Sequence, residues 1–125
     1  MKKLLSGLLL IVLASTSFAH EMVPTYPRWE PSLYGDVLKT TVEIFNKRTD
    51  VEYYEISVFD RDWKPVPFVT SYKVIQLKYL GTASIEVYIK KADRSRAEYV
   101  CSRSKLRKGS ETITAVSSTI CSRFK

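Results

Sequence analysis

Histidine, cysteine and glycine are scarce in this sequence, and their scarcity limits the chemistry that it can perform. Among 125 residues there are one histidine, two cysteines and four glycines. A Ser-His-Asp or Cys-His arrangement would have to use His20 as its base, and the sequence has neither zinc-spaced cysteines nor a glycine-rich phosphate loop. Asp60 and Asp62 form a carboxylate pair in a turn, where aspartates usually accept hydrogen bonds from backbone amides. We therefore predict that the protein is not an enzyme.

Long apolar runs are also missing, because the longest mostly apolar stretch covers only residues 4–13. This is half of the roughly 20 apolar residues that a helix needs to cross a bilayer. The stretch follows Lys2 and Lys3 and precedes Ser17-Phe18-Ala19, whose small residues are typical of a signal-peptide cleavage site. We predict a signal peptide over residues 1–19, cleavage after Ala19, and a mature chain of residues 20–125 that is periplasmic or secreted and has no transmembrane segment.

The two cysteines, Cys101 and Cys121, agree with export. An even number of cysteines in an exported chain indicates a structural disulfide. Closing a loop of this size contributes about 3 kcal/mol to stability in the chain-entropy model. The alternative, two reduced and buried thiols, would suit a cytoplasmic protein.

Basic residues are concentrated near the carboxyl end of the chain. Residues 90–125 contain ten basic and three acidic residues, whereas residues 20–89 contain eight basic and ten acidic ones. Five of the basic residues form a stripe on the last predicted hairpin: Arg103, Lys105, Arg107, Lys108 and Arg123. We predict that this stripe binds an envelope protein or an anionic surface such as lipid headgroups. The alternative is a solvated face, and nucleic acid is not expected as a partner in that compartment.

Apolar residues alternate with more polar ones along most of the chain, which is typical of strands covered on one face. The predicted strands lie within residues 37–45, 54–58, 73–79, 83–90, 96–106 and 112–124, and residues 24–34 form a proline-broken edge segment. The number of strands and the spacing of the turns predict an all-β fold. We expect a single immunoglobulin-like β-sandwich of seven strands with one disulfide.

The last hairpin can be tested for a consistent register. If Cys101 faces Cys121 in an antiparallel pair, Ser102 faces Ile120, Leu106 faces Val116, and the chain reverses near Gly109-Ser110. This register places Val100, Leu106, Val116 and Ile120 on the core face. The disulfide is then a clamp between neighbouring strands on an outer face, unlike the bridge between sheets in antibody domains.

Several segments resemble known protein families. Three predicted strands are similar to strands of the amino-terminal immunoglobulin-like domain of PapD-type periplasmic pilus chaperones. They are a strand that ends in asparagine, Val42-Glu43-Ile44-Phe45-Asn46, the aromatic strand at residues 53–59, and the strand Ala97-Glu98-Tyr99-Val100-Cys101-Ser102-Arg103. The ends of the mature chain, residues 20–27 and 120–125, also resemble small exported proteins encoded by marine phages. The chaperone resemblance implies a sandwich whose edge strand lends backbone hydrogen bonds to a partner.

The sequence departs from the chaperones in the residues of their cleft. In that family a second domain follows, and an arginine and a lysine in the cleft hold the terminal carboxylate of a pilus subunit. Arg28 is the one basic residue of the first segment here, and residues 112–121 contain no lysine or arginine. The cleft pair is therefore not carried over to this chain.

After the predicted cleavage, His20 would be the first residue of the mature chain. A terminal amine and an imidazole on one residue can together bind copper. Copper proteins of this kind add a second histidine, and here Glu21 or Met22 would have to replace it. The alternative is a frayed, solvated terminus.

Three aromatic residues of the first segment, Tyr26, Trp29 and Tyr34, leave two interpretations open. They form either a patch that binds a partner or a cover over an open edge of the sandwich. From the sequence as a whole we predict an exported, non-enzymatic interaction or chaperone-like module that presents an edge strand and a basic outer face and needs no cofactor. The alternative is a periplasmic copper-binding module centred on His20.

Overall fold

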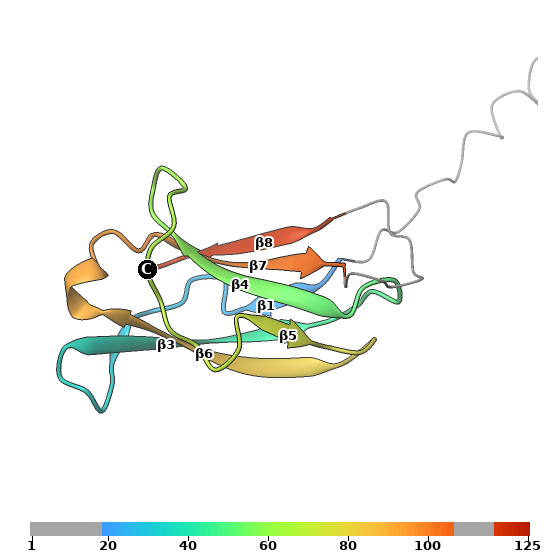
Figure 1. The fold of residues 1–125 in the computed structure, drawn as a ribbon, viewed down its shortest axis with the longest axis horizontal. Helices are drawn as coiled ribbons and strands as arrows, with labels where there is room; N and C mark the ends of the chain where they lie inside the picture. The colour runs from blue at the N-terminus through green and yellow to red at the C-terminus, as the bar shows by residue number, and fades with distance from the viewer. Residues whose placement is uncertain (1–18, 107–116) are drawn as a thin grey trace, which may run out of the picture.

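The computed structural model describes residues 19–106 and 117–125, which form a sandwich of two antiparallel sheets (Figure 1). The strands are β1 (Glu21–Val23), β2 (Glu30–Pro31), β3 (Val37–Phe45), β4 (Tyr53–Phe59), β5 (Val74–Gln76), β6 (Thr82–Lys90), β7 (Tyr99–Lys105) and β8 (Thr119–Arg123), and a short 3-10 turn, η1, covers Lys91–Asp93. In the first sheet β3 pairs with β6 along its whole length and with β1 and β2 along its other edge. The second sheet has the order β5-β4-β7-β8.

The core lies between the two sheets and follows the alternation of the sequence. On β3, for example, Leu38, Val42 and Ile44 are buried, while Thr41 and Glu43 are exposed. Fully burying one side chain of this kind contributes roughly 1.5–3 kcal/mol. Other buried members of the core come from β4, β6 and β7: Tyr54, Ile56, Val58, Ile85, Val87, Ile89 and Val100.

The prediction of an all-β, immunoglobulin-like sandwich with one disulfide is confirmed. The described residues contain eight strands instead of seven, because two short strands pair with β3 where one edge segment was predicted: β2 lies within the predicted residues 24–34, and β1 precedes them. The strand predicted over residues 73–79 is limited to β5, because pairing with β4 covers only Val74–Gln76. The turn into β6 follows, with Leu80 in a left-handed backbone conformation at a φ of 62°. The predicted signal peptide falls almost wholly on residues 1–18, outside the described residues.

The first segment closes one side of the sandwich through Trp29. The indole is half-buried and stacks on Phe124, with ring centroids 4.3 Å apart. The amide of Lys125 donates a hydrogen bond to the carbonyl of Pro27 at 3.0 Å. Trp29 therefore covers the core, whereas Tyr26 and Tyr34 remain 63% and 69% exposed.

Candidate functional site

Strand β8 forms a free edge of the second sheet. It pairs with β7 alone among the described strands. The amide of Ser104 bonds to the carbonyl of Ser118, and that of Phe124 bonds to the carbonyl of Glu98. Backbone groups of even-numbered residues therefore point toward β7, and those of odd-numbered residues point away from it. The outward set belongs to Thr119, Cys121 and Arg123, so β8 offers three residues to an added strand.

The predicted disulfide is confirmed, and so is the predicted register between Tyr99–Arg103 of β7 and Thr119–Arg123 of β8. Val116 and the predicted reversal near Gly109-Ser110 lie outside the described residues. Cys101 and Cys121 are bonded and directly opposite each other, with their Cα atoms 4.1 Å apart. This short separation is typical of an antiparallel pair whose backbones are not hydrogen-bonded to each other. One part of the prediction is wrong, because Leu106 is 53% exposed. Strand β7 ends at Lys105, before Leu106 could enter the core.

The basic stripe is less positive than the sequence suggests. The Nζ atom of Lys105 lies 3.4 Å from Glu55, and the Nε atom of Arg123 lies 2.8 Å from Glu98. Arg103 is exposed and has no ion pair with another described residue. Arg107 and Lys108 lie outside the described residues. Binding of an anionic surface by this stripe remains a prediction, and the two ion pairs reduce the charge available for it.

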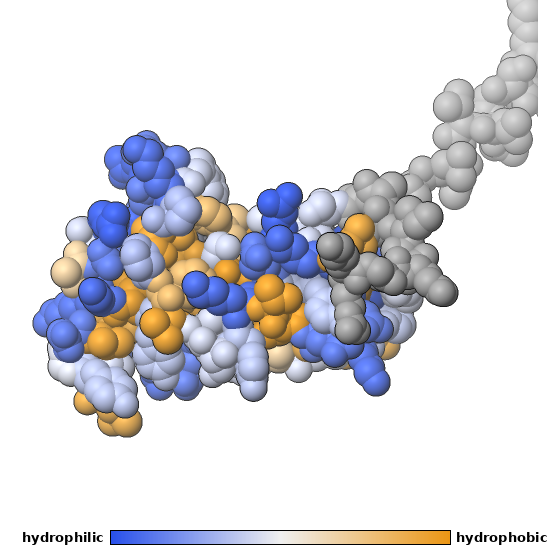
Figure 2. Space-filling view, viewed as in Figure 1, coloured by the Kyte–Doolittle hydropathy of each residue, from blue (hydrophilic) through white to orange (hydrophobic). Residues whose placement is uncertain are grey.

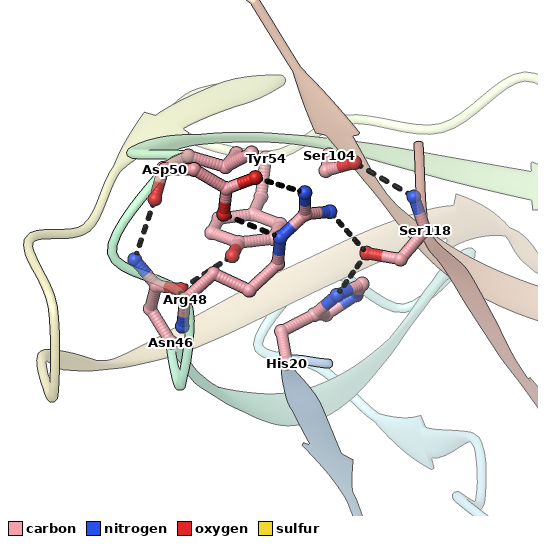
Figure 3. Close-up of polar contacts among 8 residues, drawn as sticks. His20, Asn46, Arg48, Asp50, Tyr54, Ser104 and Ser118 are labelled. Carbon is pink, nitrogen blue, oxygen red and sulfur yellow. Dashed lines mark hydrogen bonds and ion pairs between the residues drawn. The ribbon is translucent and has the colours of Figure 1, made fainter. Parts of the chain in front are cut away.

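His20 belongs to a buried polar network beneath the start of β8 (Figure 3). Its side chain is only 2% exposed, so the expectation of a solvated terminus is wrong. Nδ1 lies 3.0 Å from the hydroxyl of Ser118, and Nε2 lies 2.8 Å from that of Ser102. The ring also packs against Tyr54, with centroids 4.6 Å apart. His20 therefore connects the first segment to β7 and to the residue that precedes β8.

Both ring nitrogens of His20 thus already have hydrogen-bonding partners. Within residues 19–106 and 117–125, no group of three or more His, Cys, Asp or Glu side chains is placed to hold a metal ion. Copper would have to displace the hydroxyl of Ser102 or that of Ser118 from the imidazole. Copper binding by His20 remains a prediction, and the geometry around His20 supplies no further copper ligand from the described residues.

Arg48 and Asn46 hold the other half of the network (Figure 3). The guanidinium of Arg48 makes a two-pronged ion pair with Asp50 at 2.6 and 2.9 Å and reaches the hydroxyl of Ser118 at 3.4 Å. The amide oxygen of Asn46 accepts hydrogen bonds from the Arg48 backbone and from the hydroxyl of Tyr54. Burial raises the pKa of Tyr54 to about 12, so its hydroxyl stays protonated as a donor.

The sequence contained a signal for part of this network. The predicted register places Ser102 on the core face together with Val100, and a hydroxyl in a core requires a partner. The structure supplies that partner as His20. Asn46 and Arg48 lie between the strands predicted over residues 37–45 and 54–58, where sequence patterns do not show which way a side chain points. The Asp60 turn behaves as expected, since one carboxylate oxygen accepts hydrogen bonds from the amides of Asp62 and Lys64.

The network predicts that stability depends on pH through His20. Burial, aided by the positive charge of Arg48, lowers the pKa of His20 below 6.5, and the hydrogen bond to the carbonyl of Ser102 only partly offsets this effect. The unfolded chain therefore takes up the proton first. The contribution of neutral His20 to the free energy of unfolding is complete above pH 6.5. It is lost as the pH falls toward the pKa of His20 in the folded protein, at no more than about 1.4 kcal/mol per pH unit.

Urea unfolding at a series of pH values would measure this dependence. His20→Asn keeps a polar side chain that does not titrate, so the variant should lose the slope of stability just below pH 6.5. An identical pH profile for the variant and the wild type would show that His20 does not titrate with unfolding.

Solved structures with a similar fold come from bacterial and human proteins. The E. coli chaperone DraB is similar over 86% of this chain, with a TM-score of 0.64 and 14% identity. PapD-like domain 7 of human CEP192 is similar over 84% of this chain and 81% of its own, with a TM-score of 0.53 and 10% identity. The chain has a PapD-like immunoglobulin fold.

The likeness to DraB is limited in length, because this chain spans 54% of that protein. Neither a protein-family model nor a curated protein matches the sequence. Across the described part of the chain, no helix is long and apolar enough to span a membrane. The comparisons therefore establish the fold, and the β8 edge remains the feature from which a function can be argued.

Proposed function

We propose that this protein is an exported, non-enzymatic interaction module of the chaperone-like type, and that β8 is the strand it offers to a partner. The observation that carries the proposal is the outward row of backbone groups on Thr119, Cys121 and Arg123. An extended segment of another protein can bind such an edge by adding a strand, with main-chain hydrogen bonds giving affinity and side-chain contacts giving specificity.

The surroundings of β8 support this role because they hold the strand in a fixed position. The disulfide fixes its register on β7, and the hydroxyl of Ser118 ties its start to His20 and Arg48. At its end, Phe124 stacks on Trp29. An edge that is ordered before binding loses little conformational entropy when a partner strand is added. The exposed side chains of Arg103 and Arg123 would then favour acidic residues in the partner.

Proline substitutions test the proposal because each removes one amide hydrogen. At Arg123 the lost N–H points away from β7, so Arg123→Pro should leave the hairpin folded and weaken partner binding. At Ile120 the lost N–H belongs to the β7 ladder, so Ile120→Pro should unfold the edge and serves as the disruptive control. Circular dichroism and thermal unfolding would confirm that Arg123→Pro is folded.

Partner binding can be measured in cells that make the full chain with a photo-crosslinking amino acid at position 119. We expect a discrete adduct with another protein at this position and at least a fivefold loss of adduct in Arg123→Pro, which is the effect of losing about one hydrogen bond. A crosslinker at the exposed Thr41, on the first sheet, is the matched control and should give no such adduct. An adduct that is equally strong in Arg123→Pro would rule out strand addition at β8.

A further inference from the structure

A second candidate binding surface lies on the outer face of the second sheet, at the end where β4 finishes. Phe59 and Tyr99 face each other across β4 and β7. Trp63, from the loop after β4, stacks on Tyr99 with centroids 4.2 Å apart and planes within 7° of each other, and it meets Phe59 at 6.0 Å. We name these three residues the aromatic shelf. Trp63 remains 53% exposed, as a ring does when one of its faces is covered.

The loop holds Trp63 in a backbone conformation that disfavours a bulky residue. The φ of Trp63 is 62°, in the left-handed region. Hydrogen bonds fix this turn, because the Asp60 carboxylate accepts the amides of Asp62 and Lys64, and the Asp60 carbonyl accepts the amide of Trp63 at 3.1 Å. A strained residue that its surroundings hold in place is often part of a functional site. The strain here presents a half-exposed indole in one fixed orientation.

Charged groups around the aromatic shelf balance one another. Figure 2 shows hydrophilic residues over the loop that projects above β4. Arg61 and Lys64 lie on this loop, and Arg123 lies directly opposite Tyr99 on β8. Their charges are offset by those of Asp60, Asp62 and Glu98. These three basic and three acidic side chains sum to no net charge, so together they offer hydrogen-bond donors and acceptors without favouring an anion, an acidic lipid or nucleic acid.

We propose that the aromatic shelf binds a hexose unit of a neutral glycan. The C–H groups on one face of a pyranose ring carry partial positive charge, and the face of an indole is negative, so the two surfaces attract as they stack. Side chains such as Arg61 and Asp62 can donate to and accept from neighbouring sugar hydroxyls. A proline-rich peptide fits less well, because it needs a groove lined by several aromatic rings. Here Tyr99 lies beneath Trp63 and not beside it.

The proposal can be tested on the mature chain with defined sugars. The probes are cellohexaose, maltohexaose, mannohexaose and a galactose hexasaccharide, with hexagalacturonate as the charged comparison. Calorimetry measures affinity, and the NMR signal of the Trp63 indole N–H reports contact. We expect at least one neutral hexasaccharide to bind with a Kd at or below millimolar and to shift that signal. Binding should change little when salt is raised, because the site carries no net charge.

Variants of Trp63 separate the ring from the loop. Trp63→Gly suits the left-handed backbone, so the loop keeps its shape while the stacking surface is lost. We expect Trp63→Gly and Trp63→Ala each to weaken binding about tenfold. Tyr79→Ala removes a similarly exposed aromatic ring from another turn and should leave the affinity unchanged. Binding by none of the four neutral sugars, equal binding by Trp63→Gly, or preference for hexagalacturonate would each overturn the proposal.

Discussion

Asn46→Ala should be the most damaging single substitution in this protein, with an expected loss of about 3–5 kcal/mol in the free energy of unfolding. The Asn46 side chain is fully buried and makes four hydrogen bonds. Its amide nitrogen donates to the carbonyls of Val51 and Leu77, each at 2.8 Å. Its oxygen accepts from the amide of Arg48 and the hydroxyl of Tyr54. Alanine leaves all four of these groups without their partner.

The magnitude follows from the cost of unpaired groups. A buried donor or acceptor without a partner costs about 1–3 kcal/mol, and water that enters the space left by Asn46 would recover part of this. Whole domains are stable by only about 5–15 kcal/mol. The midpoint of thermal unfolding should therefore fall by roughly 15–30 °C, which differential scanning calorimetry would measure.

Tyr54→Phe is the matched control for Asn46→Ala. It removes one hydrogen bond of the same network and leaves the ring in the core, while the Asn46 oxygen keeps the amide of Arg48 as a donor. The expected cost is about 1 kcal/mol. If Asn46→Ala were no more damaging than Tyr54→Phe, the amide bonds to Val51 and Leu77 would contribute nothing, and the account of Asn46 would be wrong.

The regular strands could be predicted from the sequence because their pattern and their environment agree. β3 and β6 each have a long alternating pattern and one buried face, so a shift of one residue would bury their polar side chains. The position of Cys101 opposite Cys121 followed from the sequence in the same way, because a disulfide fixes which residues face each other. The strand prediction rests on periodicity, and the register prediction rests on a covalent bond.

Most of the polar network could not be predicted, because His20, Asn46 and Arg48 come from segments without a repeating pattern; the buried hydroxyl of Ser102 was its one signal in the sequence. His20 precedes the first strand, and Arg48 lies in a turn, so no period indicates that either side chain is buried. Ser118 meets both residues only when the first and last segments of the fold lie together (Figure 3). The stacking of Trp63 on Tyr99 could not be predicted either, because it depends on the left-handed backbone conformation of Trp63 itself. Hydrogen-bond requirements and backbone strain, which periodicity does not report, determine these positions.

Replacing both cysteines with alanine should produce the second large effect, and it should act mainly on β8. The two residues are separated by 20 positions, and a cross-link that closes a loop of this length contributes about 3 kcal/mol in the chain-entropy model. The bond joins the central pair of a five-residue ladder that is the sole strand pairing of β8 among the described residues. Without it, β8 should open more often than the rest of the sheet, and hydrogen exchange at Ile120 and Ser122 should accelerate.

Hydrogen exchange measured residue by residue distinguishes this local effect from a general loss of stability. The exchange rates of amides in β3 and β6 should rise only by the factor that the loss of global stability explains. The exchange rates of amides in β8 should rise by more than that factor. Wild-type protein under reducing conditions is the matched control and should reproduce the profile of the double variant. Equal acceleration in every strand would contradict a local role for the disulfide. A selective effect on β8 would mean that the bond keeps the proposed binding strand ordered, and the double variant should then also lose affinity for a partner strand.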